Sequence, residues 1–259
     1  MAESGDPYIR AVEITCSLIE TLRVGGKMGV SEIAGKMGYA KSTIYNHLVT
    51  LEKNHLVVSE DSKYRLSLHF LEIASDIKSQ HGLLHYSIIR RKVNELSAET
   101  GENARFGNEE HGELINIYQV QRSPGVSEHF QLSMREPMHC TATGKSMLAF
   151  MSQERVDEII NVRGLEQKTE NTITDYDELM KELENIRKQR FAIDDEERAT
   201  GLRCIAAPVI ENRRYRAVII GSIGIFGPVS RLSGDKLDEI TTQIQQFANM
   251  IEIACNAGK

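Results

Sequence analysis

The sequence predicts an α+β protein with two folded parts: an N-terminal winged helix-turn-helix domain and a larger C-terminal domain built on an antiparallel sheet. The first observation behind this prediction is a pair of short amphipathic helices in residues 30–56, followed at once by two strand-like runs. The second is that the strands and helices of residues 103–259 do not alternate strictly, which is typical of α+β domains. The third is the length of 259 residues, which suits two domains.

The two helices of residues 30–56 are predicted from the spacing of their apolar residues. Ile44, Leu48 and Leu51 lie at positions i, i+4 and i+7 of the second helix and form its buried stripe. Gly38 separates the two helices, as a glycine commonly does just past a helix C-terminus. The opposite face of the second helix is polar, and short polar side chains are what a helix needs to read base edges in the DNA major groove.

A hairpin is predicted directly after the second helix. Residues 57–59 and 64–66 are strand-like and residues 60–63 form the turn between them, so the whole unit is predicted to be a winged helix. Cations of the wing would contact the DNA backbone or minor groove, although Glu60 and Asp61 oppose this. The alternative interpretation is a small helical hairpin with a solvated polar face. The candidate DNA-binding residues are Ser31, Lys41, Ser42, Thr43, Tyr45, Asn46, His47, Thr50, Lys53, Lys63 and Arg65.

Composition and charge narrow the class of protein. The net charge of −6 excludes a protein whose whole surface binds nucleic acid, and residues 23–56 carry only a modest local surplus of cations. Because that surplus is small, two linked copies of the module would help it to bind DNA. No apolar run approaches the roughly 20 residues that span a bilayer. The first ten residues lack a signal-peptide pattern, so we expect a cytoplasmic protein.

The cysteines and histidines do not indicate a metal or redox site. The four cysteines are scattered without a CxxC pair, which favours reduced, mostly buried thiols over a disulfide or a zinc site. His81 and His85 are four residues apart, but no third ligand and no HExxH pattern accompanies them. We therefore expect no metal and no cofactor.

The remaining elements follow from periodicity and turn residues. A connecting helix over residues 68–78 has more apolar positions than a solvated linker needs, which favours a packed or dimer-forming helix. The other predicted elements are helices at residues 8–22, 86–100, 144–151, 154–161, 176–190 and 237–254, strands at 104–108, 114–120 and 128–133, and a hairpin of residues 204–210 and 217–225.

Three stretches of the C-terminal part are candidates for small-molecule chemistry. Residues 139–145 enter a helix, whose free N–H groups suit a carboxylate, and Thr141 and Thr143 add hydroxyl donors; plain N-capping is the alternative. The acidic residues 194–197 could bind a metal or act as acid and base, but more commonly such a run is a solvated turn. The glycines of residues 221–228 do not fit a phosphate loop and indicate close approach of a ligand or of another backbone.

Taken together, these motifs resemble the IclR family of transcriptional regulators. In the N-terminal part the resemblance is carried by Lys41-Ser42-Thr43, by Leu51 and by Tyr64-Arg65-Leu66. In the C-terminal part it is carried by residues 139–145, 194–198, 201–208, 227–228 and 231–232. The two halves occur in one order and cover nearly the whole chain, which makes the resemblance specific.

The resemblance implies a winged-helix domain, a linker helix and a GAF-like effector-binding domain, which we place at residues 1–67, 68–85 and 86–259. It also implies binding to operator DNA, homodimers that are often paired into tetramers, and a small organic acid or aromatic metabolite as the effector. Family members act as repressors or activators. We expect a ligand-responsive repressor of metabolic genes and not an enzyme, because no activated nucleophile, metal set or cofactor loop is present in the sequence.

The family pattern also assigns effector contacts. It places them at Ala142, Thr143, Asp194, Leu202 and Cys204 of this chain. Two departures affect the specificity of both sites. Asn46 stands where the family's recognition helix usually has Arg, which favours adenine over guanine. In the second departure, Gly224 and Phe226 stand on the strand where some members have serines. The candidate effector-binding residues are Thr141, Ala142, Thr143, Asp194, Leu202, Cys204, Ser222, Gly224 and Phe226.

Gly224 and Phe226 in place of those serines make the predicted pocket more apolar, which favours a bulkier or partly apolar acid over glyoxylate or pyruvate. Asp194 beside an anionic ligand would stay protonated, accept a hydrogen bond from a ligand hydroxyl, or orient Arg203. Two rival functions use the same residues: an enzyme acting on a small acid, and an interaction module whose winged helix binds protein.

Overall fold

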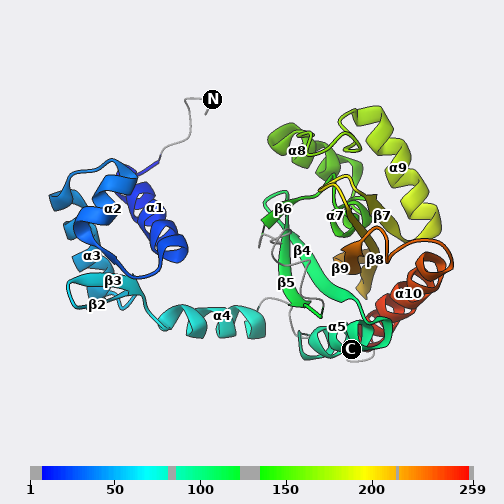
Figure 1. The fold of residues 1–259 in the computed structure, drawn as a ribbon, viewed down its shortest axis with the longest axis horizontal. Coiled ribbons are helices and arrows are strands. Elements are labelled where there is room, and N and C mark those ends of the chain that lie inside the picture. The colour runs from blue at the N-terminus through cyan, green and yellow to red at the C-terminus, as the bar shows by residue number, and fades with distance from the viewer. Residues whose placement is uncertain (1–7, 81–85, 123–134, 214–215, 257–259) are drawn as a thin grey trace. The chain divides into compact units, whose positions relative to one another are not determined.

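The structure, a computed structural model, describes residues 8–80, 86–122, 135–213 and 216–256 (Figure 1). The chain divides into two compact units, Met1–Leu84 and His85–Lys259, which are described separately below. The predicted strand at residues 128–133 and the histidine pair His81 and His85 lie outside the described residues. Among the described residues, no helix is both long and apolar enough to cross a membrane.

The N-terminal unit is a winged helix. Its three strands form an antiparallel sheet in the order β1-β3-β2. Gly38 ends α2 in the left-handed conformation, with φ at 72°, which a residue without a Cβ adopts most readily. The elements are α1 (Arg10–Gly25), β1 (Met28–Gly29), α2 (Val30–Met37), α3 (Lys41–Lys53), β2 (Val57–Glu60) and β3 (Lys63–Leu66).

One apolar core holds these elements together. Leu18 and Leu22 of α1 pack in it with the α3 stripe of Ile44, Leu48 and Leu51. Helical periodicity predicts this stripe correctly, because all three side chains are buried. Strand β1 has only two residues and pairs Met28 with Tyr64; it is too short to leave a periodic pattern in the sequence.

Helix α4 (His69–Gln80) follows the wing. It corresponds to the connecting helix predicted over residues 68–78. Its apolar side chains are exposed instead of packed: Leu71 is 68% exposed and Ile77 is 49% exposed, as is Leu68 just before the helix at 73%. Exposed apolar faces of this kind commonly form interfaces with another protein surface.

The C-terminal unit is a six-stranded antiparallel sheet with helices on both faces (Figure 1). The strand order is β6-β5-β4-β9-β8-β7, which places the long β8–β9 hairpin beside β4. The elements are α5 (Tyr86–Thr100), β4 (Asn103–Glu110), β5 (Glu113–Val120), β6 (Arg135–Pro137), α7 (Ala142–Leu148), α8 (Gln153–Arg163), α9 (Tyr176–Gln189), β7 (Ala192–Asp195), β8 (Leu202–Arg213), β9 (Arg216–Pro228) and α10 (Asp235–Asn256).

The two faces of the sheet are covered by different helices. Helix α7 packs on β8 and β9, and its core includes Cys204, Ala206 and Phe226. Because side chains alternate along a strand, the intervening residues Ile205 and Ile225 point to the other face, where α10 packs against β8, β9 and α5. The chemistry predicted for residues 139–145 and 194–204 therefore lies in the layer between α7 and the sheet.

The glycines of β9 allow close packing of backbones, which was one of the two roles expected for them. A Cβ built on Gly224 would lie 2.7 Å from the carbonyl oxygen of Ile205 on the neighbouring strand. A ligand is therefore not needed to explain this glycine.

Gly144 permits the close approach of α7 to the segment before it. A Cβ at this position would lie 2.3 Å from the carbonyl oxygen of Met138 and 2.6 Å from the hydroxyl of Thr141. Both atoms belong to the turn that starts the helix, so the neighbours cannot yield without moving α7.

We expect Gly144→Ala to lower the free energy of unfolding by about 1–3 kcal/mol, the usual cost of overpacking a core. Chemical denaturation of the full chain measures it. The matched control is Gly35→Ala in α2, where an added Cβ meets no atom within 4 Å. That substitution should be neutral or stabilise by up to about 1 kcal/mol. Equal stability of Gly144→Ala and the wild type would show that α7 does not pack as described.

Candidate functional sites

The first candidate site is the exposed face of α3. Ser42, Tyr45 and Asn46 are exposed, with Tyr45 at 52%, and lie opposite the buried stripe of the same helix. Lys41 and Lys53 are exposed at its two ends, and Ser31 is exposed at the start of α2. The structure therefore presents hydrogen-bonding side chains and cations on one surface, as a helix in a major groove requires.

Three other predicted DNA-binding residues of α3 make contacts within the chain. Thr43 is half-buried, and the Thr50 hydroxyl donates to the carbonyl of Asn46. His47 is half-buried, and its Nδ1 lies 2.8 Å from the hydroxyl of Thr15 on α1. Because that hydroxyl donates its proton to the carbonyl of Ala11, the histidine nitrogen is the donor. His47 therefore joins α3 to α1, and its contact with DNA stays a prediction.

The wing neutralises its own acidic residues. Arg65 binds Glu60 at 2.5 Å, and Lys27 lies 3.4 Å from Glu60 and 3.1 Å from Asp61. The hydrogen bond from Arg65 lowers the pKa of the exposed Glu60 carboxyl. Arg65 is therefore engaged within the wing, whereas Lys63 is exposed near the wing tip. These ion pairs offset the repulsion that the carboxylates of Glu60 and Asp61 were expected to exert on DNA.

The second candidate site begins at the N-terminus of α7. Thr141 is the N-cap residue: its hydroxyl accepts a hydrogen bond from the Gly144 N–H at 3.2 Å and donates to the carbonyl of Pro137 at 2.9 Å. Both hydrogen-bonding roles of the hydroxyl are used. Of the two interpretations of this stretch, N-capping describes the contacts of Thr141, and its contact with a ligand stays a prediction.

Thr143 contacts a buried arginine that sequence reasoning missed. Arg105 of β4 is 1% exposed, and its Nε donates to the Thr143 hydroxyl at 3.1 Å. Its Nη1 donates to the carboxylate of Glu136 on β6 at 2.9 Å, and its guanidinium lies 5.6 Å from the ring centroid of Phe226. A buried guanidinium is costly unless it is paired and hydrogen-bonded, so these contacts fix its place.

Asp194 lies at the end of β7, opposite Cys204 on β8. It is 0% exposed and Glu197 is also buried, so only Asp195 and Glu196 of the acidic run contact solvent. Its Oδ1 accepts from the backbone N–H groups of Glu197 and Arg198, while its Oδ2 has no hydrogen-bond partner among the described residues. Burial raises the pKa of the Asp194 carboxyl to about 6.

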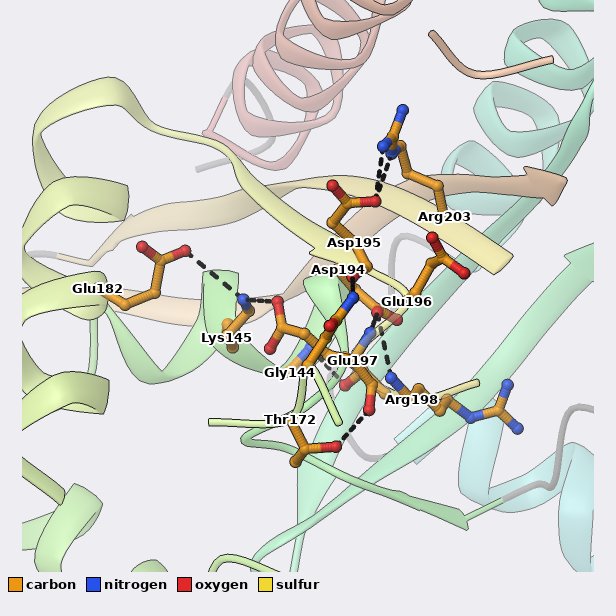
Figure 2. Close-up of polar contacts among 12 residues, drawn as sticks. Gly144, Lys145, Thr172, Glu182, Asp194, Asp195, Glu196, Glu197, Arg198 and Arg203 are labelled. Atoms are coloured by element: carbon orange, nitrogen blue, oxygen red, sulfur yellow. Dashed lines mark hydrogen bonds and ion pairs between the residues drawn. The ribbon is translucent and has the colours of Figure 1, made fainter. Parts of the chain in front are cut away.

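Asp195, and not Asp194, orients Arg203. The two guanidinium nitrogens of Arg203 lie 2.6 and 2.8 Å from the Asp195 carboxylate (Figure 2). Consecutive strand residues point to opposite faces, so only one of the two aspartates can face α7. The expectation that Asp194 orients Arg203 is therefore wrong.

A buried lysine fixes the turn after β7 against α7. Lys145 is 1% exposed; its ammonium contacts the Glu197 carboxylate and lies 3.5 Å from that of Glu182 on α9 (Figure 2). The backbone carbonyl of Glu197 accepts from the hydroxyl of Thr172 at 2.6 Å. Burial raises the pKa of the Glu197 carboxyl to about 7, against the opposing effect of Lys145. The turn that carries Asp194 and Arg198 is thus held in one position.

The other candidate effector residues divide into two groups. Ala142, Leu202, Cys204 and Phe226 are buried together in the apolar core beneath α7. Ser222 is committed to structure: its hydroxyl donates to the carbonyl of Ala207 and pairs with the hydroxyl of Ser146 at 2.6 Å, and Gly224 faces the backbone of β8. The assignment of Ser222 and Gly224 to a ligand-binding role stays a prediction.

The cysteines of this layer are unreactive. Burial raises the pKa of the Cys140 thiol to about 12 and that of the Cys204 thiol well above its usual value. A nucleophilic cysteine needs a lowered pKa. Among the described residues, no three His, Cys, Asp or Glu side chains are grouped so as to hold a metal ion.

Arg105, Glu136, Lys145 and Arg198 are the polar groups of the site that were not predicted. A signal for Arg105 exists: it is a cation between two apolar residues, Ala104 and Phe106, in a predicted buried strand. For Glu136 and Arg198 no local signal exists, because their partners come from distant parts of the chain.

The fold and these two sites define a class of protein: a winged-helix DNA-binding domain joined to an α+β domain with a buried polar site. Comparison with known proteins supports this class. Residues 11–61 match the IclR helix-turn-helix domain, and residues 80–253 match the family described as bacterial transcriptional regulator IclR C-terminal. The chain belongs to the IclR family of transcriptional regulators.

Individual relatives are similar over most of the chain. The transcriptional repressor IclR of Escherichia coli is 30% identical over 232 residues, which cover 88% of this chain and 83% of the relative. The crystal structure of Thermotoga maritima IclR has a TM-score of 0.78 at 25% identity and covers 96% of this chain and 99% of its own. An IclR homolog from Microbacterium hydrocarbonoxydans, complexed with 4-hydroxybenzoate, has a TM-score of 0.79 at 18% identity over 95% of this chain and 98% of its own, which shows the fold.

The raised pKa of Asp194 makes stability depend on pH. In the unfolded chain its pKa returns to near the ordinary aspartate value of 3.8, so the folded chain holds the proton more tightly and loses stability as the pH rises from about 4 to about 6. We expect the free energy of unfolding to fall by about 1 kcal/mol between pH 5 and pH 7.5 on account of this group. Asp194→Asn should reduce that fall, as measured by urea unfolding at both pH values.

The matched control is Asp195→Asn, which removes a charge from the same strand but from an exposed side chain. It should keep the wild-type difference between the two pH values. An undiminished difference in Asp194→Asn would show that this carboxyl is ionised throughout the range.

Proposed function

We propose that the chain is a ligand-responsive repressor that binds operator DNA as a homodimer and changes its DNA affinity when a small organic acid binds beneath α7. The observation that carries this proposal is the buried polar site of Arg105, Thr143 and Asp194, in a domain joined to an exposed DNA-reading helix. A protein that only bound DNA would not need polar groups inside a second domain. The E. coli relative is named a repressor, which supports the sign of regulation.

The exposed face of α3 supports DNA reading by Ser42, Tyr45 and Asn46. An asparagine can pair with adenine through both its donor and its acceptor. In a homodimer, two such helices would enter successive major grooves about 34 Å apart. The cations Lys41, Lys53 and Lys63 would contact phosphates, as the weak local surplus of positive charge allows.

Exposed apolar side chains support the homodimer. Tyr8, Ile9 and Val12 at the start of α1 are 73%, 70% and 55% exposed, and Leu68 and Leu71 beside and within α4 are also exposed. Soluble chains rarely leave such groups uncovered, and a second copy covers them symmetrically. We assign residues 1–67 to DNA binding, 68–85 to the linker and 86–259 to effector binding. Pairing of two dimers into a tetramer stays part of this proposal.

The effector proposal is supported by the buried polar site and by the 4-hydroxybenzoate complex of the Microbacterium homolog. A ligand changes DNA affinity only through its different affinity for the two states of the regulator. A transcriptional repressor acts where the chromosome is, so we place it in the cytoplasm.

The test is a gel-shift titration of the purified chain on the intergenic DNA beside its own gene, at two salt concentrations and with excess competitor DNA. A shift that resists competitor at both salts supports specific DNA binding. Small organic acids are then screened for release or tightening of the complex. A complete lack of binding to that DNA and to genomic fragments would contradict the proposal and favour a winged helix that binds protein.

Asn46→Ala separates DNA reading from folding. We expect operator affinity to fall about tenfold or more, since a good bidentate base contact contributes about 1–3 kcal/mol of discrimination. The melting temperature should stay within about one degree of the wild type, because the side chain is exposed. The same substitution at Asn161, exposed on α8, is the matched control and should change neither quantity. A large drop in the melting temperature of Asn46→Ala would mean that the face is wrongly assigned.

Thr143→Ala tests the effector site. Loss of the hydroxyl removes the acceptor for Arg105 Nε and one polar group beside the proposed ligand. We expect the concentration of acid needed for half-maximal change in the gel shift to rise about tenfold. Thr242→Ala, on the exposed surface of α10, should leave the titration unchanged. A wild-type titration in Thr143→Ala would remove this residue from the site.

A further inference from the structure

Two arginines share one buried carboxylate in the C-terminal domain. Glu136 is 2% exposed; its Oε2 accepts from Arg105 Nη1 at 2.9 Å, and its Oε1 lies 3.4 Å from Arg198 Nη2. Arg198 reaches it from the turn after β7, and Figure 2 shows this side chain extending away from Lys145. Strands β4 and β6 and the turn after β7 are thus joined at one point.

Three polar atoms of this group have no hydrogen-bond partner among the described residues. They are Nη2 of Arg105, Nη1 of Arg198 and Oδ2 of Asp194, and each is buried. Native proteins pair nearly all buried polar atoms, because an unpaired one loses its hydrogen bonds to water and gains none from the protein. Three such atoms in one place indicate a ligand that supplies one acceptor group and one donor group.

Asp194 belongs to the same place as Arg105. Asp194 pairs with Cys204 across β7 and β8, and Cys204 pairs with Phe226 across β8 and β9. The Arg105 guanidinium lies 5.6 Å from the centroid of the Phe226 ring. The thiol and the aromatic ring therefore form an apolar surface between the cationic and the acidic end.

The charges select the kind of acceptor. At the cationic end, the two guanidinium groups face the single carboxylate of Glu136 and leave a surplus of one positive charge, which a monoanion balances; the Asp194 carboxyl lies at the acidic end. One Nη group of each arginine is without a partner among the described residues, and the two together match the two oxygens of a carboxylate. A phosphate dianion would exceed the surplus and lie close to the carboxylates of Glu136 and Asp194, which repel it.

We propose that Arg105 and Arg198 bind the carboxylate of the effector while Asp194 accepts a hydrogen bond from a hydroxyl of the same molecule. The effector is then a hydroxy monocarboxylic acid whose apolar body lies against Cys204 and Phe226. This inference rests on the proposed function, and it names the groups that would select the ligand.

The first experiment uses the full wild-type chain and two matched sets of probes in isothermal titration. The aromatic set is 4-hydroxybenzoate, benzoate and 4-hydroxybenzamide; the aliphatic set is 3-hydroxybutyrate, butyrate and 3-hydroxybutyramide. In at least one set, the hydroxy acid should bind at least tenfold more tightly than both the acid without the hydroxyl and the amide. Equal binding by either analogue, or no binding by both hydroxy acids, would overturn the inference.

The second experiment tests the arginines with the hydroxy acid that binds. Arg198→Gln and the double variant Arg105→Gln/Glu136→Gln, which removes both charges of the buried pair together, should each weaken its binding at least tenfold. Arg190→Gln removes a cation that pairs with Glu252 on α10 and is the matched control with wild-type affinity. If the double variant fails to fold by circular dichroism, Arg198→Gln decides the outcome, because its side chain is 15% exposed. Wild-type affinity in Arg198→Gln would contradict the assignment.

A gel shift of the wild-type chain without ligand distinguishes the two proposals. DNA binding together with loss of the predicted acid selectivity would overturn only the inference about Arg105, Arg198 and Asp194. Failure to bind DNA would overturn the proposed function, whatever the titrations show.

Discussion

The ion pair between Arg105 and Glu136 is the interaction on which the rest of the C-terminal domain depends. It places a charge of each sign inside the layer between α7 and the sheet, beside the apolar core of the domain. Buried pairs of this kind rarely add stability over apolar side chains of equal size, because both charges give up their hydration. Their retention in the domain core therefore indicates a role beyond stability, and ligand recognition is the role that the neighbouring unpaired atoms support.

The position of this site also indicates how a ligand would be sensed. Its groups come from β4, from the edge strand β6, from α7 and from the turn after β7. These elements are joined by polar contacts, whereas β8 and β9 form a long antiparallel ladder with one register shift at Val209 and Ile210. A ligand that completes the polar contacts would favour one arrangement of the edge elements over another. The ligand can change the DNA affinity of a dimer only through its different affinity for these two arrangements.

The sequence was sufficient where the information is local. Helical periodicity separated the buried stripe of α3 from its polar face, and turn residues located the wing and the β8–β9 hairpin. It was insufficient where contacts join distant residues. The hydrogen bond of His47 to Thr15, the partnership of Arg105 with Glu136, and the exchange of roles between Asp194 and Asp195 all depend on packing or strand register. Periodicity predicts which face of a helix or strand a residue lies on, but it does not predict which distant residue it contacts.

The central claim is that an acid binds at the buried arginines and thereby acts on the regulator. A crystal structure of the full chain with a hydroxy acid that alters its gel shift tests this most directly. The account predicts density for the ligand carboxylate within hydrogen-bond distance of Arg105 and Arg198, with the hydroxyl beside Asp194. Density at another place, such as the surface groove lined by Gly112, Ile160 and Arg163, with the arginines unchanged, would contradict it.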